Sequence, residues 1–459
     1  MKLVSSSLPA LGLALLLTAA PLVAQLNDGK PDPDFPVPDS LDLPYALAFA
    51  LDNNFTIRQA KERIRQQQGV VVEVRAAGLP NVTAAGGYQR NAVEISSNGE
   101  SSNWSIDVTA RQTLFAGGGV VAGVRSQKLA LEAAVLDLEA VINDALLDVR
   151  TRFYTVLVNR EKIKVQEQNV DLLQRQLQDV KNRFEAGTVS NFEVLRAEVA
   201  LANAQTPLIT ARNDYRLAIE ELRQALGFVT HTETNVTKLP DFVGTLDFTP
   251  TSFDLRSALV SAREHRPDLL RLVKLEHSAE EGVFVSRASY YPAVSVFGSY
   301  DARDGGILYG PNTPSQLKGW TVGLQSQWSI FDGRATAGRV AQSRSLLEQA
   351  KLSLAATELA VDVDVRRSVS TFQEATELAG ASKKVVEQAE EALRLANARF
   401  NAGTATQLDV LTSQVDLTTA RLNQVQAYYS YNIAVATTRK AMGLTDEARP
   451  TKELTYPQK

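Results

Sequence analysis

Four stretches of the chain alternate between apolar and polar residues with the period of two that is typical of β-strands. They span about residues 80–91, 103–115, 292–302 and 319–331. In the last stretch one face would carry Trp320, Val322, Leu324, Trp328 and Ile330, and the other would carry Thr321, Gln325, Gln327 and Ser329. A soluble sheet with one buried face alternates in this way, and so does a membrane strand between lipid and water.

The spacing of tryptophans favours the membrane alternative. Trp320 and Trp328 lie eight residues apart, which is about 26 Å at ~3.3 Å per residue of extended chain. That distance is close to the height of the apolar band between two aromatic girdles. Trp104 occupies the position in the second stretch that Trp320 has in the fourth. We therefore expect all three tryptophans to belong to a membrane aromatic girdle.

Two longer stretches have helical periodicity and contain no proline, from Gly117 to Gly187 and from Gly333 to Gly403. Each covers about 70 residues, or roughly 105 Å at 1.5 Å per residue. Apolar residues recur in both with heptad spacing, which predicts coiled coils. The heptad positions are Ile163, Leu173, Val170, Leu177, Val180 and Phe184 in the first, and Val386, Ala389, Leu393, Ala396 and Phe400 in the second.

Each long helical stretch ends in nearly the same sequence, "NRFEAGTVSNFEVL" at 182–195 and "ARFNAGTATQLDVL" at 398–411. The glycine suits a left-handed helix cap and a second helix follows, so each sequence predicts the tip of a helical hairpin. Ser190 with Glu193, and Thr406 with Asp409, have the spacing of a capping box. The second helices are expected to bury Phe192, Leu195, Val199 and Ala202, and Leu408, Leu411, Val415 and Thr418.

The matched strands and hairpins divide the chain into two structural repeats, residues 42–227 and 254–443, with tips at about 183–195 and 399–411. The predicted fold is therefore mainly α, with four β-strands per chain as a small membrane part. The remaining segments are interpreted as a signal peptide (1–24), a Pro-rich extended lead-in (25–41), a linker (228–253) and a C-terminal tail (444–459).

Composition and motifs exclude several classes of function. The net charge of −4 and the lack of a basic run give no reason to expect nucleic acid as a partner. The absence of cysteine removes thiol nucleophiles and thiolate ligands. His231, His265 and His277 have no acid or second histidine at ligand spacing on a helix face, so we expect no metal site. No catalytic signature is present, and we expect no catalytic residues, no cofactor and no enzymatic activity.

With a signal peptide, two repeats of strand pair and helical hairpin, and "RFxAGTxxxxxVL" at both tips, the chain resembles the TolC-like outer membrane factor family. The resemblance implies a homotrimer whose strands form one 12-stranded outer-membrane barrel, surrounded by lipid and continued by an α-helical barrel through the periplasm. It implies an exit duct with porin activity in a tripartite efflux or type I secretion system. A periplasmic adaptor (membrane fusion) protein and an inner-membrane pump would deliver the substrates.

The resemblance also implies roles for residues at the tips. The adaptor would dock on Arg183, Phe184, Gly187, Arg399, Phe400 and Gly403. Well-known members carry two acids one turn apart at the pore constriction and a basic residue after the glycine. Asp409 matches the first acid, whereas Thr412 and Ala405 occupy the other two positions, so Asp409 and Thr412 are the constriction candidates.

A further tip contact is expected to be missing. The tyrosine that ties the inner to the outer coil in the family corresponds to Phe400, although its acidic partner is matched by Glu193. The small Ala389 and Ala396 favour the second hairpin as the one that lines the pore. A non-transporting coiled-coil envelope scaffold or adhesin remains the alternative function.

Overall fold

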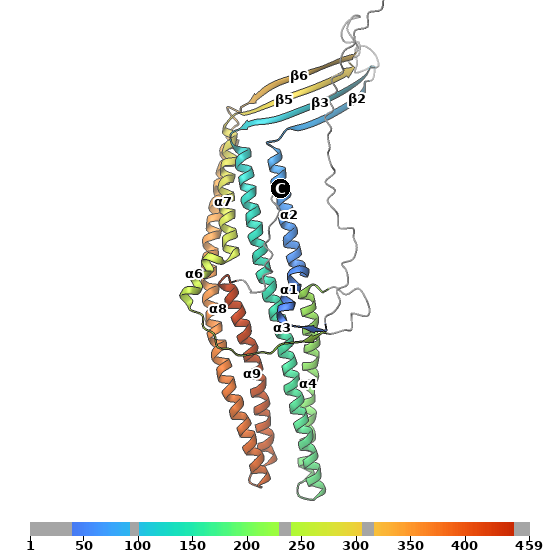
Figure 1. The fold of residues 1–459 in the computed structure, drawn as a ribbon, viewed down its shortest axis with the longest axis vertical. Helices are drawn as coiled ribbons and strands as arrows, with labels where there is room; N and C mark the ends of the chain where they lie inside the picture. Colours follow the sequence, from blue (N-terminus) through green and yellow to red (C-terminus); the bar gives the residue numbers. More distant parts are fainter. Residues whose placement is uncertain (1–38, 92–100, 229–239, 305–315, 445–459) are drawn as a thin grey trace, which may run out of the picture. The chain divides into compact units, whose positions relative to one another are not determined.

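Two helices of 67 residues each, α3 (Gly119–Glu185) and α8 (Ala335–Asn401), run the length of the two hairpins (Figure 1). Each continues through a short turn into a return helix, α4 (Asn191–Leu226) or α9 (Gln407–Ala441). The computed structural model describes residues 39–91, 101–228, 240–304 and 316–444. The predicted signal peptide, most of the lead-in and nearly all of the C-terminal tail lie outside the described residues.

Both repeats contain two shorter helices and a strand pair before the long helix. The first repeat has α1 (Leu43–Asn53), α2 (Phe55–Ala76), β2 (Asn81–Asn91) and β3 (Ser101–Ala116). The second has α6 (Leu255–His265), α7 (Pro267–Arg287), the 3-10 turn η1 (Ala288–Tyr290), β5 (Ala293–Asp304) and β6 (Gln316–Gln327). This order confirms the predicted fold of two long helical hairpins and four strands in the sheet.

The four strands form one antiparallel sheet in the order β2-β3-β5-β6. Strand β6 ends at Gln327, so the strand predicted to reach residue 331 is too long at this end. Trp328 therefore lies just beyond the sheet, and its Nε1 donates a hydrogen bond to the Tyr290 carbonyl oxygen at 3.1 Å. Apolar and polar residues continue to alternate beyond Gln327. Residue alternation does not depend on backbone pairing, so it does not locate the end of a strand.

The two faces of the sheet differ in polarity. One row across the strands consists of Ala84, Val108, Tyr300 and Trp320, and the next row on the other face consists of Thr83, Thr109, Ser299 and Thr321. In the single chain Trp320 is 77% exposed and Leu324 is 72% exposed. Because a soluble sheet buries its apolar face against another layer, this exposed apolar face requires a different partner.

The segment between the repeats crosses the helices as an ordered strap where it is described. Its short strand β4 (Asp241–Phe242) pairs in parallel with β1 (Ser40–Leu41). Phe242 is buried against Phe153, with ring centroids 6.3 Å apart, and the Arg160 guanidinium donates to the Gly244 carbonyl oxygen at 2.6 Å. These contacts fasten the strap to the largest core cluster, which α1, α2, α3 and α4 share.

The glycines at 117–119 form a hinge between β3 and α3. Gly117 and Gly118 have φ values of 59° and 78° and connect β3 to α3. A Cβ on Gly117 would lie 2.4 Å from the Ala288 carbonyl oxygen. Glycine is therefore required here both for the left-handed backbone and for the close approach of η1.

The predicted heptad positions of α3 and α8 are buried or partly buried, except that Phe184 is 44% exposed. The core predicted for the return helices is wrong. Phe192, Leu195 and Val199 are 67%, 53% and 59% exposed, whereas Val194 and Ala197 on the adjacent face are buried. The same holds for α9, where Leu408 and Val415 are 48% and 63% exposed. The buried positions up to residue 420 are instead Gln407, Val410, Gln414, Leu417 and Ala420. Each return helix thus has two apolar faces, of which its own hairpin covers one.

Candidate functional site

The two hairpin turns have the same backbone conformation. Gly187 and Gly403 both have a φ of 72°. In the first turn the N–H of Gly187 donates to the Phe184 carbonyl at 2.8 Å, and the N–H of Thr188 donates to the Arg183 carbonyl at 2.9 Å. The second turn repeats these bonds from Gly403 to Phe400 and from Thr404 to Arg399. Both are Schellman turns, in which glycine tolerates the left-handed conformation.

The second return helix begins with the predicted capping box. The backbone N–H of Thr406 donates to Asp409 Oδ2 at 2.8 Å, and the N–H of Asp409 donates to Thr406 Oγ1 at 3.3 Å. The hydrogen bonds from the Thr406 backbone and hydroxyl lower the pKa of the exposed Asp409 below its ordinary value. Asp409 and Thr412, three residues apart, are both exposed on α9. Whether they line a pore depends on further copies of the chain.

The first return helix lacks the capping box that its sequence predicts. Ser190 makes no side-chain cap hydrogen bond. The Oε2 atom of Glu193 is instead buried, with no hydrogen-bond partner among the described residues. Glu193 is one methylene longer than Asp409, and no hydrogen bond joins its carboxylate to Ser190 in the described structure. The same spacing therefore gives two different tips.

The two tips are joined by a contact of a different kind from the family's tyrosine link, which is expected to be missing here. The Arg183 guanidinium lies over the Phe400 ring, 4.9 Å from its centroid. It also donates to Asn401 Oδ1 at 3.3 Å and to Asp179 Oδ2 at 2.9 Å. Arg183 and Phe400 were each singled out in the sequence, but their pairing was missed because it depends on how the hairpins lie together.

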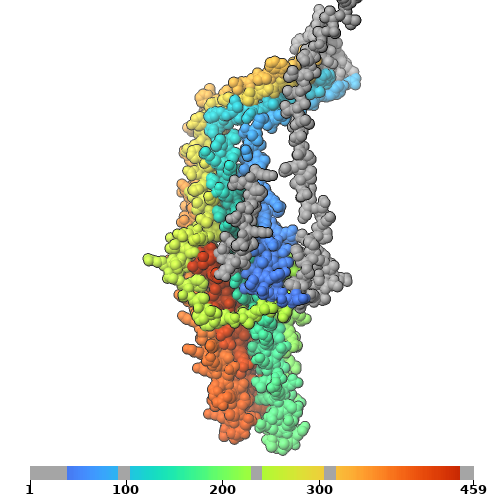
Figure 2. Space-filling model, in the orientation of Figure 1, coloured from blue at the N-terminus to red at the C-terminus, as the bar shows by residue number. Residues whose placement is uncertain are grey.

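The hairpins also contact each other farther from the tips, where α9 packs beside α3. Arg421 donates to Gln168 Oε1 of α3 at 3.0 Å, and within its own hairpin it donates to Glu390 Oε1 of α8 at 2.8 Å. Gln414 donates to Asn169 Oδ1 at 3.1 Å. Figure 2 shows the two hairpins as adjacent green and orange-red columns. These polar contacts hold both tips at the same end of the structure.

The six predicted docking residues are not equivalent between the tips. Phe184 is 44% exposed, whereas Phe400 is half-buried and packs on the core of the second hairpin. Gly187, Gly403 and Arg399 are exposed. The two turns thus offer similar backbones and different side-chain surfaces to a partner.

The three tryptophans lie in or beside the sheet. Trp104 is on β3 opposite Tyr88 of β2, and Trp320 is on β6 opposite Tyr300 of β5. Trp328 directly follows Gln327, the last residue of β6, at the end of the sheet next to the helices, and it is 56% exposed. The structure places two aromatic groups on the sheet and one at its junction with the helices.

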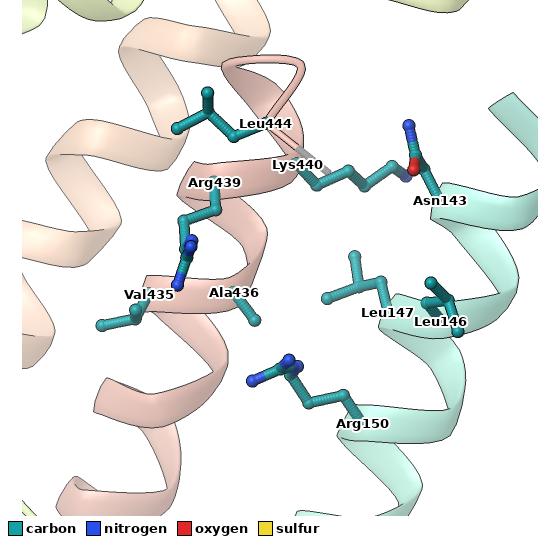
Figure 3. Close-up of a pocket in the computed structure, with 9 residues that line it drawn as sticks. All are labelled: Asn143, Leu146, Leu147, Arg150, Val435, Ala436, Arg439, Lys440 and Leu444. Atoms are coloured by element: carbon teal, nitrogen blue, oxygen red, sulfur yellow. The ribbon is translucent and has the colours of Figure 1, made fainter. Parts of the chain in front are cut away.

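A small cleft lies between α3 and α9 (Figure 3). Its volume is about 40 Å³, and its walls include Leu147, Arg150 and Arg439. Lys440 at its edge forms an ion pair with Asp144. Such a space holds water molecules and no larger ligand.

Metal-ligand clusters and membrane-spanning helices are two further features on which the described residues give information. No three His, Asp or Glu side chains gather there in a way that could hold a metal ion, and His231 lies outside this part of the chain. None of the helices in the same part is both long and apolar enough to cross a membrane.

Comparisons with known proteins agree with one another. The family model described as "Outer membrane efflux protein" matches residues 47–228 and 258–444. Nodulation protein T of Rhizobium leguminosarum bv. viciae is 25% identical over 407 residues, which cover 83% of this chain and 77% of that protein. The outer membrane protein TolC of Vibrio cholerae serotype O1 is 23% identical over 385 residues, covering 82% and 85% of the two chains.

The fold is also that of a solved channel. The crystal structure of CusC, a protein described as undergoing transmembrane channel formation, superposes with a TM-score of 0.75 at 14% identity. The superposition covers 91% of this chain and 95% of CusC. Both repeats of the chain are therefore included in the shared architecture.

Proposed function

Because the chain belongs to the outer membrane efflux protein family, we propose that three copies assemble into an exit duct across the outer membrane and into the periplasm. A lone sheet leaves β2 and β6 as open edges, and in lipid each unpaired backbone group costs several kcal/mol. Two copies would supply eight strands, enough only for a barrel filled by side chains. Three copies supply 3 × 4 = 12 strands and a lumen that can conduct.

The observation that carries this proposal is the two-faced sheet. Its apolar rows, which include Val108, Tyr300 and Trp320, would face lipid. Its polar rows, which include Thr109, Ser299 and Thr321, would face the water-filled lumen. An outward apolar band with a polar interior is the pattern of outer-membrane barrels. In this arrangement the tryptophans belong to the aromatic girdles.

The helices would continue the duct, with the second apolar face of each return helix packed on a neighbouring hairpin. The exposed Phe192, Leu195 and Val199 of α4 support this assignment because they form a stripe that the single chain leaves uncovered. The small Ala389 and Ala396 suit the second hairpin to the narrow inner position. Three Asp409 carboxylates would then surround the axis, with Thr412 one turn away, and favour cations.

The tips would receive a periplasmic adaptor protein that connects the duct to an inner-membrane pump. Six turns of similar backbone around a trimer suit a ring of adaptor hairpins. Gly403→Leu should impair export while leaving a folded trimer, because only the left-handed turn is strained. Normal export by that variant would show that the turn is not part of the docking surface.

Planar-bilayer recordings of the purified protein, combined with cell fractionation, test the proposed function. The protein should fractionate with the outer membrane and give discrete, cation-preferring conductance steps. A coiled-coil scaffold or an adhesin would give no channels, and that result would refute the duct.

A further inference from the structure

A pocket of about 310 Å³ lies where the second repeat passes from helix to sheet. Its walls include Arg287 at the end of α7, Tyr290 in η1 and Tyr291 directly after it, together with Val340 and Arg344 on α8. The two helices are brought together beside the arginines, since the hydroxyls of Ser286 and Ser343 are 2.6 Å apart. The duct function described above does not use this pocket.

The pocket carries positive charge that the described part of the chain does not neutralise. Arg287 lies over the Phe284 ring at 6.0 Å, but neither it nor Arg344 has an acidic partner among the described residues. The nearby Asp332 is already engaged, because it accepts the Thr336 backbone N–H at 2.7 Å and lies 4.0 Å from Arg339. Two guanidinium groups without a carboxylate form a site suited to an anionic oxygen group such as a phosphate.

The surroundings of the pocket are those of a membrane interface. Tyr291 lies two residues before the start of β5 at Ala293, which pairs with Gln327 at the end of β6. Trp328 follows directly and donates its indole N–H to the Tyr290 carbonyl. Ile330 and Phe331 are 83% and 85% exposed. Aromatic side chains concentrate at the level of lipid headgroups, with apolar side chains toward the acyl chains.

We propose that this pocket binds an anionic phospholipid of the periplasm-facing leaflet. Arg287 and Arg344 hold the headgroup phosphate, the tyrosine hydroxyls supply further donors, and the acyl chains lie against Ile330 and Phe331. The bound lipid fixes the depth of the sheet in the membrane. The site depends on the outer-membrane location of the chain and not on the identity of the exported substrate or its pump.

Only the second repeat has the complete set of side chains. The aligned positions in the first repeat are Arg75 and Lys128 for the arginines, with Gly78 and Leu79 in place of the tyrosines. The first repeat therefore retains two positive charges but lacks the aromatic part of the site. This difference provides an internal control at the same level of the fold.

The test is native mass spectrometry of the purified full-length protein in detergent, with added palmitoyl-oleoyl phosphatidylglycerol, phosphatidylcholine or inorganic phosphate. The protein should retain phosphatidylglycerol in preference to phosphatidylcholine. Arg287→Gln with Arg344→Gln should weaken retention by roughly tenfold or more, because charge-assisted hydrogen bonds are lost. Arg75→Gln with Lys128→Gln should leave it unchanged, and lysine at positions 287 and 344 should preserve most of it.

Four results would overturn the proposal. The first is equal retention of phosphatidylglycerol by the double glutamine variant at positions 287 and 344. The second is an equal loss in the first-repeat control, which would indicate a general effect of surface charge. The third is displacement of the lipid by millimolar inorganic phosphate, which would indicate a site for soluble anions. The fourth is loss of the oligomer in the double variant, which would assign the arginines to a contact between copies of the chain.

Discussion

Removing the Arg183 side chain should separate the two hairpin tips of one chain. Its guanidinium lies 4.9 Å from the Phe400 ring centroid, and 34% of the side chain is exposed. At that exposure a cation–π contact contributes about 0.5–1 kcal/mol, and the 3.3 Å hydrogen bond to Asn401 adds about 0.5 kcal/mol. Arg183→Ala should therefore shift the equilibrium toward separated tips by about five- to twelvefold.

The assay uses the fact that the chain contains no cysteine. Spin labels on Ala186→Cys and Ala402→Cys, both next to the turn glycines, report the distance between the tips of one labelled copy diluted among unlabelled copies. Arg399→Ala is the matched control, because Arg399 holds the same place in the second repeat and its side chain has no ring or polar partner in the described part of the chain. An unchanged distance distribution in Arg183→Ala, or an equal change in the control, would refute the reasoning.

Four further predictions concern the tips and the return helices. Thr406→Val should destabilise the second hairpin by about 1 kcal/mol in chemical denaturation, whereas Ser190→Val should have little effect; equal losses would contradict the two different caps. Asp409→Asn should reduce cation selectivity in bilayers. Because the pKa of Asp409 is lowered below 3.8 in the folded state, its capping contribution should be complete above that value and disappear only as the pH falls through the lowered pKa; a loss already at pH 5 would contradict this. Val199→Ser should weaken association between copies in analytical ultracentrifugation without altering the helical circular dichroism, and an unchanged association would remove this stripe from the interface.

Much of the fold follows from local sequence signals. The long helices, the four strands of the sheet and the two glycine turns were predicted because heptad spacing, alternation and left-handed caps each depend on neighbouring residues. The Thr406 capping box was predicted for the same reason. At Ser190 the same spacing gives no capping box, and the Oε2 atom of the longer Glu193 side chain is buried instead.

The remaining features depend on contacts between distant segments. The exposed stripe at Phe192 and Val199 was mistaken for the hairpin core because both faces of α4 carry apolar residues at helical spacing. The pairing of Arg183 with Phe400 joins residues 217 positions apart (400 minus 183) and has no local signature. The end of β6 at Gln327 is set by backbone pairing with β5, which residue alternation does not report.

Cysteine cross-linking between edge strands in intact outer membranes tests the closed trimer most directly. One cysteine replaces Thr83 on β2, and the second is moved along β6 from Thr321 to Gln325, since these are the edges that would pair between copies. In a closed trimer, one pairing register gives a covalent trimer on oxidation and nothing larger, while each single cysteine gives only monomers. A ladder of products beyond three chains, or no cross-link at any position along β6, would contradict it.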